Sequence, residues 1–157
     1  MFEKAMIHRL LLGLTASAFL ITGTATADDG HDDDNDAVKY RHQVMATMGS
    51  SFGAFILLFM NKVEQPEKHL VANARILATA AALTADLVPE GSQGGEALPA
   101  IWDDMDEYQK LAQEVADATA SLAASAEAGD RAGMGKAFKA AGQSCKGCHD
   151  KFREEDD

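Results

Sequence analysis

Apolar residues recur three or four positions apart through most of the chain after residue 36. Prolines at 66, 89 and 99, and glycines clustered at 91–95 and 129–135, divide this pattern into four segments: 36–62, 66–87, 103–127 and 130–154. Spacings of three and four place apolar residues on one face of an α-helix. The pattern therefore predicts four amphipathic helices, and no stretch of useful length alternates as a β-strand does.

Each predicted helix carries an apolar stripe, and four long helices with short links predict an all-α fold, an antiparallel four-helix bundle. The longest link, 88–102, contains Gly94-Gly95 and is expected to form irregular structure over an opening. Asp36 and Asp130 are predicted N-caps. The stripes are Val38, Arg41, Met45, Met48, Phe52, Phe55 and Phe59 in the first helix; Leu70, Ala74, Leu77 and Ala81 in the second; Tyr108, Leu111, Val115, Ala118 and Leu122 in the third.

The first 27 residues have a different pattern. Lys4 and Arg9 precede a short apolar run, and the small residues Ala25-Thr26-Ala27 follow it. This order predicts a secretory signal peptide, 1–27, cleaved after about Ala27. A membrane anchor is the alternative, but the run is shorter than the roughly 20 residues that a spanning helix needs. We therefore expect an exported chain with an acidic flexible N-terminus, 28–35, and a bundle at 36–154.

The charge of the chain limits its partners. Its formal net charge is −11 at pH 7 and becomes slightly more negative when the signal peptide is removed. An acidic domain is poorly suited to the electrostatic attraction that dominates nucleic-acid binding, and anionic lipid would repel it. We therefore expect no nucleic-acid partner and no membrane association after cleavage, whereas a positively charged protein remains a candidate.

The chain's only cysteines lie in the predicted fourth helix, within the stretch Cys145-Lys146-Gly147-Cys148-His149. The stripe of this helix is Met134, Phe138, Ala141, Cys145, Cys148 and Phe152. Both thiols therefore face the bundle interior, and His149 is adjacent in angle to Cys148. One helical face thus presents two thiols and an imidazole together.

Several interpretations of this stretch compete. A thioredoxin-like dithiol usually follows a β-strand, and none is predicted. A disulfide within a continuous helix is geometrically awkward and closes a very small loop. Structural zinc needs more ligands, and the other histidines of the mature chain, His31, His42 and His69, have no ligand-like spacing. The remaining interpretation is c-type haem attachment, in which the thiols bond to the vinyl groups and the next histidine binds the iron.

Three separated segments resemble the cytochrome c′ family, the class II cytochromes c. They are SCKGCHDKFR at the attachment site, AVKYRHQVMATMGSSFGAF in the first helix and GGEALPAIW before the third. The resemblance spans about residues 36–154. It implies a periplasmic bundle with one haem c, bound covalently through Cys145 and Cys148, and His149 as the proximal ligand. In most members the iron is five-coordinate and binds nitric oxide or carbon monoxide, and a redox protein is a further candidate partner.

Further residues correspond to positions of that family. Arg41 matches an arginine that contacts a haem propionate. As a charged residue on an apolar stripe, it needs an anionic partner inside the bundle, and a propionate could supply one. The alternative is that its side chain extends to solvent at the end of the bundle. His42 stands where the family commonly has glutamine, and its imidazole could still donate a hydrogen bond to the haem. Glu96 occupies a common aspartate position near the haem edge, with a solvated loop carboxylate as the alternative. Arg153 matches a basic residue on the proximal side, or pairs with neighbouring carboxylates.

Met45 matches the distal position of the family. We expect an open, five-coordinate iron there; the alternative is a low-spin electron carrier with His149 and Met45 as axial ligands. An enzyme would need a distal acid–base residue, and the stripe near Met45 offers none, so no enzymatic activity is expected. Trp102 also matches and is expected to pack.

The run 52–60 is apolar on more than one face, which, with the resemblance, predicts a homodimer through the first helix; a wider intramolecular core is the alternative.

Overall fold

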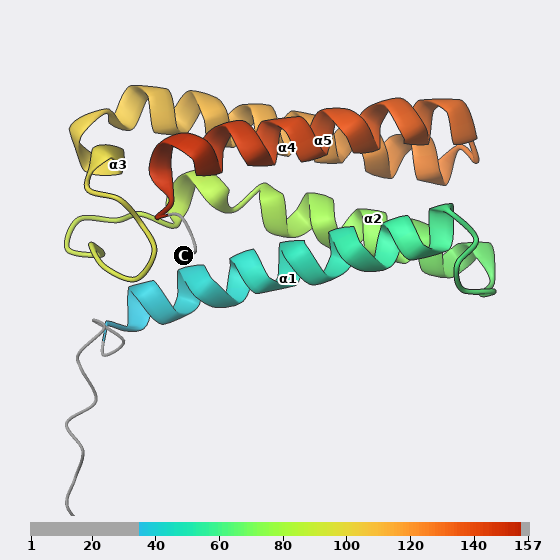
Figure 1. The fold of residues 1–157 in the computed structure, drawn as a ribbon, viewed down its shortest axis with the longest axis horizontal. Helices are drawn as coiled ribbons and strands as arrows, with labels where there is room; N and C mark the ends of the chain where they lie inside the picture. The colour runs from blue at the N-terminus through green and yellow to red at the C-terminus, as the bar shows by residue number, and fades with distance from the viewer. Residues whose placement is uncertain (1–34, 155–157) are drawn as a thin grey trace, which may run out of the picture.

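A computed structural model describes residues 35–154, so the predicted signal peptide and almost all of the acidic N-terminus lie outside the described residues. The long helices are α1 (Asp36–Phe59), α2 (Glu67–Ala81), α4 (Met105–Glu127) and α5 (Arg131–Phe152). A 3₁₀ turn, η1 (Thr84–Asp86), and a short helix, α3 (Ala100–Asp103), lie between α2 and α4. The long helices run alongside one another as a bundle (Figure 1), which confirms the predicted all-α fold.

The second helix is shorter than predicted: it ends at Ala81 rather than at residue 87. Pro89 has no N–H and disfavours helical backbone in the preceding residue, which stops any helix near residue 88 but does not account for the earlier end at Ala81. The chain instead forms η1, whose carbonyls bond to α4. The Tyr108 hydroxyl donates to the Thr84 carbonyl at 2.7 Å, and Gln109 Nε2 donates to the Ala85 carbonyl at 2.9 Å.

Side-chain caps mark where α1, α4 and α5 begin, and caps had been predicted for α1 and α5. Asp130 caps α5 as predicted, because its Oδ1 accepts a hydrogen bond from the Gly133 N–H at 3.0 Å. The prediction of Asp36 as the cap of α1 was wrong by one residue. Asn35 is the cap, and its Oδ1 accepts from the Ala37 N–H at 2.9 Å. Both residues satisfy N–H groups that have no partner within the helix.

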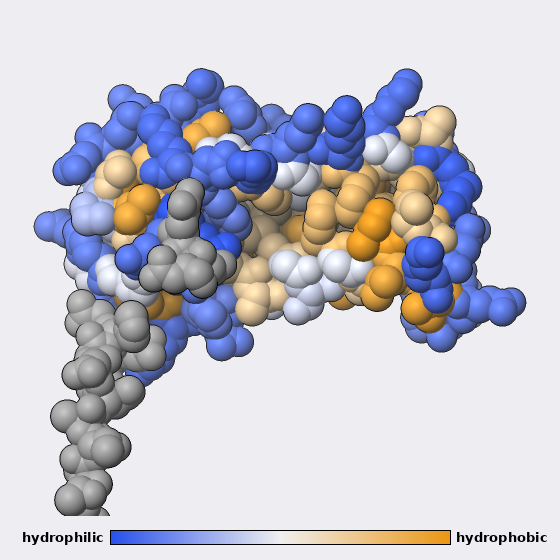
Figure 2. Space-filling model, viewed as in Figure 1, coloured by the Kyte–Doolittle hydropathy of each residue, from blue (hydrophilic) through white to orange (hydrophobic). Residues whose placement is uncertain are grey.

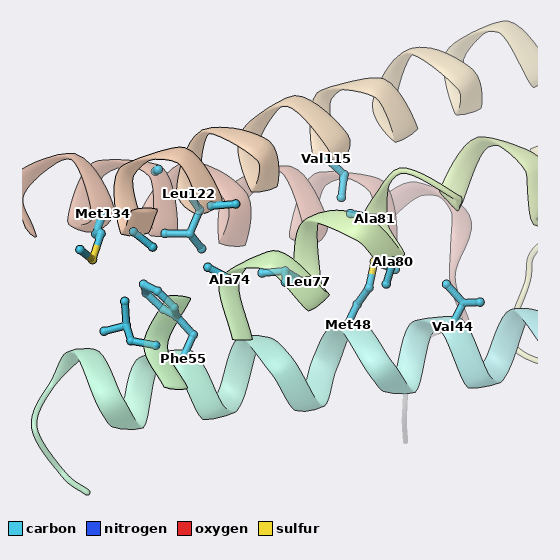
Figure 3. Packing of buried hydrophobic residues seen from close by; sticks show 14 of the residues in the cluster. Val44, Met48, Phe55, Ala74, Leu77, Ala80, Ala81, Val115, Leu122 and Met134 are labelled. Atoms are coloured by element: carbon cyan, nitrogen blue, oxygen red, sulfur yellow. The ribbon is translucent and has the colours of Figure 1, made fainter. Parts of the chain in front are cut away.

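The main core lies between the helices, away from the link that contains α3. Phe55, Leu77, Leu122 and Met134 are almost completely buried there and come from α1, α2, α4 and α5 respectively. Figure 3 shows Phe55 of α1 extending toward the other helices. The predicted stripe of α2 is entirely buried. The buried face of α1 is rotated slightly from the predicted stripe. Val44 and Ser51, which were not predicted, are buried. Of the predicted stripe, four residues are buried and three are only partly buried: Val38, Arg41, Met48 and Phe55, and then Met45, Phe52 and Phe59.

The helices do not all pack equally closely. Within residues 35–154, close backbone packing joins α1 to α2, α2 to α4, and α4 to α5, but not α1 to α5. Aromatic rings fill the gap between α1 and α5 at one end, where Phe52 stacks on Phe138 with centroids 4.2 Å apart and Phe55 lies 5.6 Å from the same ring. The other end of this gap, where α1 begins and α5 ends, is hollow.

Candidate functional site

The hollow end of the gap between α1 and α5 is a cavity of about 560 Å³. Its lining comes from the first turns of α1, the link before α3, α3 itself, the start of α4 and the last turns of α5. All seven predicted site residues lie in or beside it. Six line it directly: Arg41, His42, Met45, Glu96, Cys148 and His149. Cys145 lies one helical turn before Cys148 and packs against the main core.

The two thiols lie on a continuous stretch of α5 and do not form a disulfide. Cys148 is 7% exposed and Cys145 is partly buried. Burial raises the pKa of the Cys148 thiol to about 11, and the neighbouring Cys145 contributes to the rise. Burial likewise raises the pKa of Cys145. Both sulfurs are therefore neutral thiols at neutral pH, which argues against a redox dithiol, whose attacking thiol needs a lowered pKa.

His149 follows Cys148 and faces the same cavity. Burial lowers the pKa of its imidazole, and the nearby cation Arg153 lowers it further, whereas Glu96 and Asp150 act in the opposite direction. The ring is therefore neutral at neutral pH. A neutral imidazole has the lone pair that a metal ion requires.

Arg41 is buried, with 7% of its surface exposed, so it does not extend to solvent at the bundle end. Its guanidinium donates to three backbone carbonyls of the link between α2 and α3. Nη1 bonds to the Ser92 carbonyl at 2.9 Å and, more weakly, to the Leu87 carbonyl at 3.4 Å. Nη2 bonds to the Gly94 carbonyl at 2.8 Å. Neutral backbone carbonyls therefore satisfy part of the hydrogen bonding of this buried cation, and its further N–H groups could bond to an anion such as the predicted propionate.

Glu96 and Arg153 form an ion pair across the cavity mouth, with Arg153 Nε 2.9 Å from Glu96 Oε2. Glu96 is thus paired rather than simply solvated. Arg153 is the C-cap of α5, because the helix ends at Phe152. Glu96 lies on the link before α3, so this pair joins the link to the end of α5. The pair brings both signs of charge close to His149.

Two features of the site had not been recognised from the sequence. Tyr108 lines the cavity, is 3% exposed and hydrogen-bonds to the Thr84 carbonyl. The sequence did place Tyr108 on the apolar stripe of the predicted third helix. Because a buried hydroxyl needs a hydrogen-bond partner, that position could have marked Tyr108 as a site residue. Trp102 packs beside Cys148 and Phe152 as expected, but its indole Nε1 is buried without a hydrogen-bond partner among the described residues.

These residues fit a c-type haem better than a bare metal ion. Two neutral thiols and a neutral imidazole lie on consecutive turns of one helix, beside a cavity that also contains a buried cation suited to a carboxylate. Among residues 35–154, no group of three or more histidine, cysteine, aspartate or glutamate side chains could hold a metal ion on its own. Cys145 and Cys148 would hold the porphyrin and His149 would bind the iron.

Comparison with known proteins agrees with this site. A family model described as Cytochrome C′ matches residues 36–153. The cytochrome c′ of Alcaligenes xylosoxydans xylosoxydans is 35% identical over 119 residues, which cover 76% of this chain and 94% of that protein. That of Pararhodospirillum photometricum is 37% identical over 123 residues, covering 74% and 95%. A cytochrome c-554 of Cereibacter sphaeroides is 32% identical over 127 residues, covering 76% and 93%.

Solved structures give the same result. A nitric oxide complex of a mutant cytochrome c prime from Alcaligenes xylosoxidans matches with a TM-score of 0.72 at 35% identity, covering 77% of this chain and 95% of that one. A carbon monoxide-bound variant matches with a TM-score of 0.71 at 35% identity, covering 76% and 95%. The family match spans the whole described bundle, including the cavity and the thiol pair. The chain therefore belongs to the cytochrome c′ family.

Proposed function

We propose that this protein is an exported, periplasmic haem protein that binds nitric oxide or carbon monoxide at an open iron position. The observation that carries the proposal is the cavity between α1 and α5, which has His149 on the α5 side and Met45 on the α1 side. When bound, the haem supplies a ferrous iron that takes up a diatomic gas. The chain attaches one haem c through Cys145 and Cys148, and its neutral His149 binds the iron.

Met45 covers the open side of the iron in this proposal. It is a partly buried, apolar side chain from α1, so it restricts access without offering a hydrogen bond to a bound gas. The nitric oxide and carbon monoxide complexes of the Alcaligenes xylosoxidans protein, at 35% identity, support gas binding by this chain. The role is binding rather than catalysis, because Met45 cannot serve as an acid–base group.

The second candidate is electron transfer by a low-spin haem in which Met45 is the sixth ligand. The presence of a thioether in the cavity favours it, because a methionine sulfur can bind a haem iron. This role would need a redox protein as partner. The two candidates differ in one measurable property, the spin state of the resting iron.

Absorption spectroscopy of the purified haem protein tests the choice. We expect a high-spin ferrous spectrum that changes on addition of carbon monoxide, and faster carbon monoxide binding by Met45→Ala with an unchanged resting spin state. A wild-type protein that is low-spin, and that Met45→Ala converts to high-spin, would establish the electron carrier instead. Covalent attachment is tested separately: the haem should stay with the chain in acid acetone and should be lost from the double variant Cys145→Ser, Cys148→Ser.

We also propose that the protein is a homodimer that buries the outer face of α1. Among the described helices, α1 is the one long and apolar enough to cross a membrane by length and composition, yet only 17% of its apolar window is buried within the chain. Tyr40 and Leu57 of α1 are each about half exposed, at 56% and 48%. Figure 2 shows hydrophobic residues gathered on the visible face at the end farther from the α3 link.

Sedimentation velocity tests the dimer. A second copy would cover the exposed apolar side chains of α1, which is the usual way for such a surface to be satisfied. We expect a dimer at micromolar concentration, and a shift toward monomer when Leu57 of α1 is replaced by glutamate. Replacement of the exposed, polar Gln113 of α4 by glutamate is the control. Sedimentation as a monomer throughout would contradict the proposal.

A further inference from the structure

The link between α2 and α4 crosses the open end of the cavity. In Figure 1 it loops around the end of the bundle where α1 begins and α5 ends. Within this link, residues 94–98 pass from contacts with α1 to contacts with α5, and we name them the strap. The strap joins two helices whose own backbones are not closely packed.

On the α1 side, the strap is held by a hydrogen bond and by close packing. The Gly94 carbonyl accepts from Arg41 Nη2 at 2.8 Å. A Cβ atom on Gly95 would lie 3.0 Å from Val38 Cγ1, closer than side chains normally pack. Gly95 also has φ +58°, a conformation that glycine adopts without steric cost. The backbone of the strap therefore rests directly on α1.

On the α5 side, the strap forms a short antiparallel pairing with the end of the helix. The Leu98 N–H donates to the Phe152 carbonyl at 3.0 Å, and the Glu154 N–H donates to the Glu96 carbonyl at 2.8 Å. Ala97 and Arg153 are bridge partners between these two bonds. The Glu96–Arg153 ion pair, at 2.9 Å, adds a side-chain contact at the same place.

The strap is thus a short tether across the cavity mouth. The chain reaches the α5 contact at Ala97 only three residues after the α1 contact at Gly94, and an extended chain spans at most about 3.6 Å per residue. The α1 side of the cavity therefore cannot move far from the α5 side without breaking these bonds. At the other end of the gap, the stacked rings of Phe52 and Phe138 serve as the second fixed point.

We propose that the strap sets the separation of α1 from α5 at the cavity, and with it how closely Met45 approaches the iron bound to His149. Met45 extends from α1 and His149 from α5, so the distance between these helices is the distance that decides whether a gas ligand fits. The proposal rests on the proposed function for its iron, but the strap itself consists of residues of this chain. Arg41 is, in these terms, a positioning residue that holds the strap on α1.

The test compares two alanine variants in the haem-loaded protein. Gly95→Ala adds a methyl group against Val38 and pushes the strap off α1. Gly91→Ala is the matched control, because Gly91 also has a positive φ, +80°, but a Cβ there meets nothing within 4 Å. We expect Gly95→Ala to raise the carbon monoxide association rate several-fold above that of Gly91→Ala. Amide hydrogen exchange at Leu98 and Glu154 should also become faster in Gly95→Ala alone.

A rescue variant separates the Val38 contact from general strain. The double variant Gly95→Ala, Val38→Ala removes the methyl group that the new Cβ meets, so both the gas rate and the amide exchange should return toward those of Gly91→Ala. Equal rates and equal exchange in Gly95→Ala and Gly91→Ala would overturn the inference. If Gly95→Ala does not accumulate with haem, Glu96→Gln replaces it, because this change weakens the pair with Arg153. Its control is Glu90→Gln in the same link. Carbon monoxide association and amide exchange should both be faster in Glu96→Gln than in Glu90→Gln. No difference between those two variants would likewise overturn it.

Failure of the proposed function has a different signature. If the wild-type iron is low-spin and does not take up carbon monoxide, the gas-binding role is wrong. The strap would then control a Met45–iron bond, and Gly95→Ala should show a larger high-spin fraction than Gly91→Ala. An identical spin state in these two variants would overturn the inference in that case as well.

Discussion

Replacement of Arg41 by methionine should destabilise the protein by several kilocalories per mole. The side chain is 7% exposed and makes two short bonds, to the Ser92 and Gly94 carbonyls, and a longer one to the Leu87 carbonyl. A hydrogen bond from a charged donor contributes about 1.5–3 kcal/mol, and a buried carbonyl left without a partner costs about as much. The two short bonds alone therefore give a loss of about 3–6 kcal/mol. Methionine keeps the volume, so little of this loss comes from a cavity.

Urea unfolding of the haem-loaded protein, followed by circular dichroism, measures the loss. Arg75→Met is the matched control, because Arg75 is also a cation on a helix but forms an exposed ion pair with Glu127. Exposed pairs contribute about 0–1 kcal/mol, so this variant should unfold almost as the wild type does. Arg41→Lys should fall between wild type and Arg41→Met, because an ammonium group keeps the charge but cannot reach carbonyls in the same planar arrangement.

Hydrogen exchange shows whether the loss comes from the link. Loss of the carbonyl bonds should speed exchange of the amides between residues 87 and 98 before global unfolding. The reasoning is wrong if Arg41→Met unfolds within 1 kcal/mol of the wild type, or if a larger loss leaves exchange in this segment unchanged. In the second case the stabilisation by Arg41 would come from another partner, such as a haem carboxylate.

Three further predictions concern the bundle itself. Phe138→Ala should cost about 2–4 kcal/mol in urea unfolding, because its ring stacks between α1 and α5 but is only partly buried; a loss below 1 kcal/mol would contradict this. Asp130→Ala removes the α5 cap and should cost about 1 kcal/mol by the same assay, whereas Asp130→Asn should restore most of it. Burial raises the pKa of Tyr108 well above that of an unfolded tyrosine, which is about 10. Above pH 10 the unfolded chain loses the tyrosine proton before the folded chain does. The stability that Tyr108 contributes is therefore complete below pH 10 and is lost as the pH rises further. Tyr108→Phe should therefore lower the free energy of unfolding by about 1 kcal/mol at pH 7. Above pH 10 the free energy of unfolding should fall less steeply with pH in this variant than in the wild type, and an equal fall in both would contradict the prediction.

The sequence predicted the helices well because their signals are local. Three-and-four spacing, the Asp130 cap and the Pro89 break each act within a few residues, and each was visible in the chain. The error at the end of α2 came instead from contacts that are distant along the chain. The end of α2 at Ala81 was missed because the carbonyls of η1 bond to Tyr108 and Gln109, which are more than 20 residues away along the chain.

The relative placement of the two thiols and the imidazole was predictable for a similar reason. Cys145, Cys148 and His149 lie on one helix, so their relative placement follows from helical geometry. The partners of Arg41 could not be predicted in this way. They are carbonyls of an irregular link about 50 residues away, and nothing in a stripe pattern indicates where such a link turns its backbone oxygens. The Glu96–Arg153 pair was missed for the same reason, because it joins that link to the end of α5.

The position of the cavity follows from how unevenly the chain fills the gap between α1 and α5. At one end the gap contains three phenylalanine rings, Phe52, Phe55 and Phe138, which pack against one another and need no cofactor. At the other end α1 contributes Met45, and α5 contributes Cys148 and His149. The rings that line this end, Tyr108 of α4 and Phe152 of α5, contact each other edge to face, and no aromatic pair among residues 35–154 joins α1 to α5 here. The strap holds the two helices at that end without packing between them. A bundle built in this way keeps its fold at the aromatic end and leaves the strapped end free to accept a flat prosthetic group, with its thiols and imidazole already on one wall.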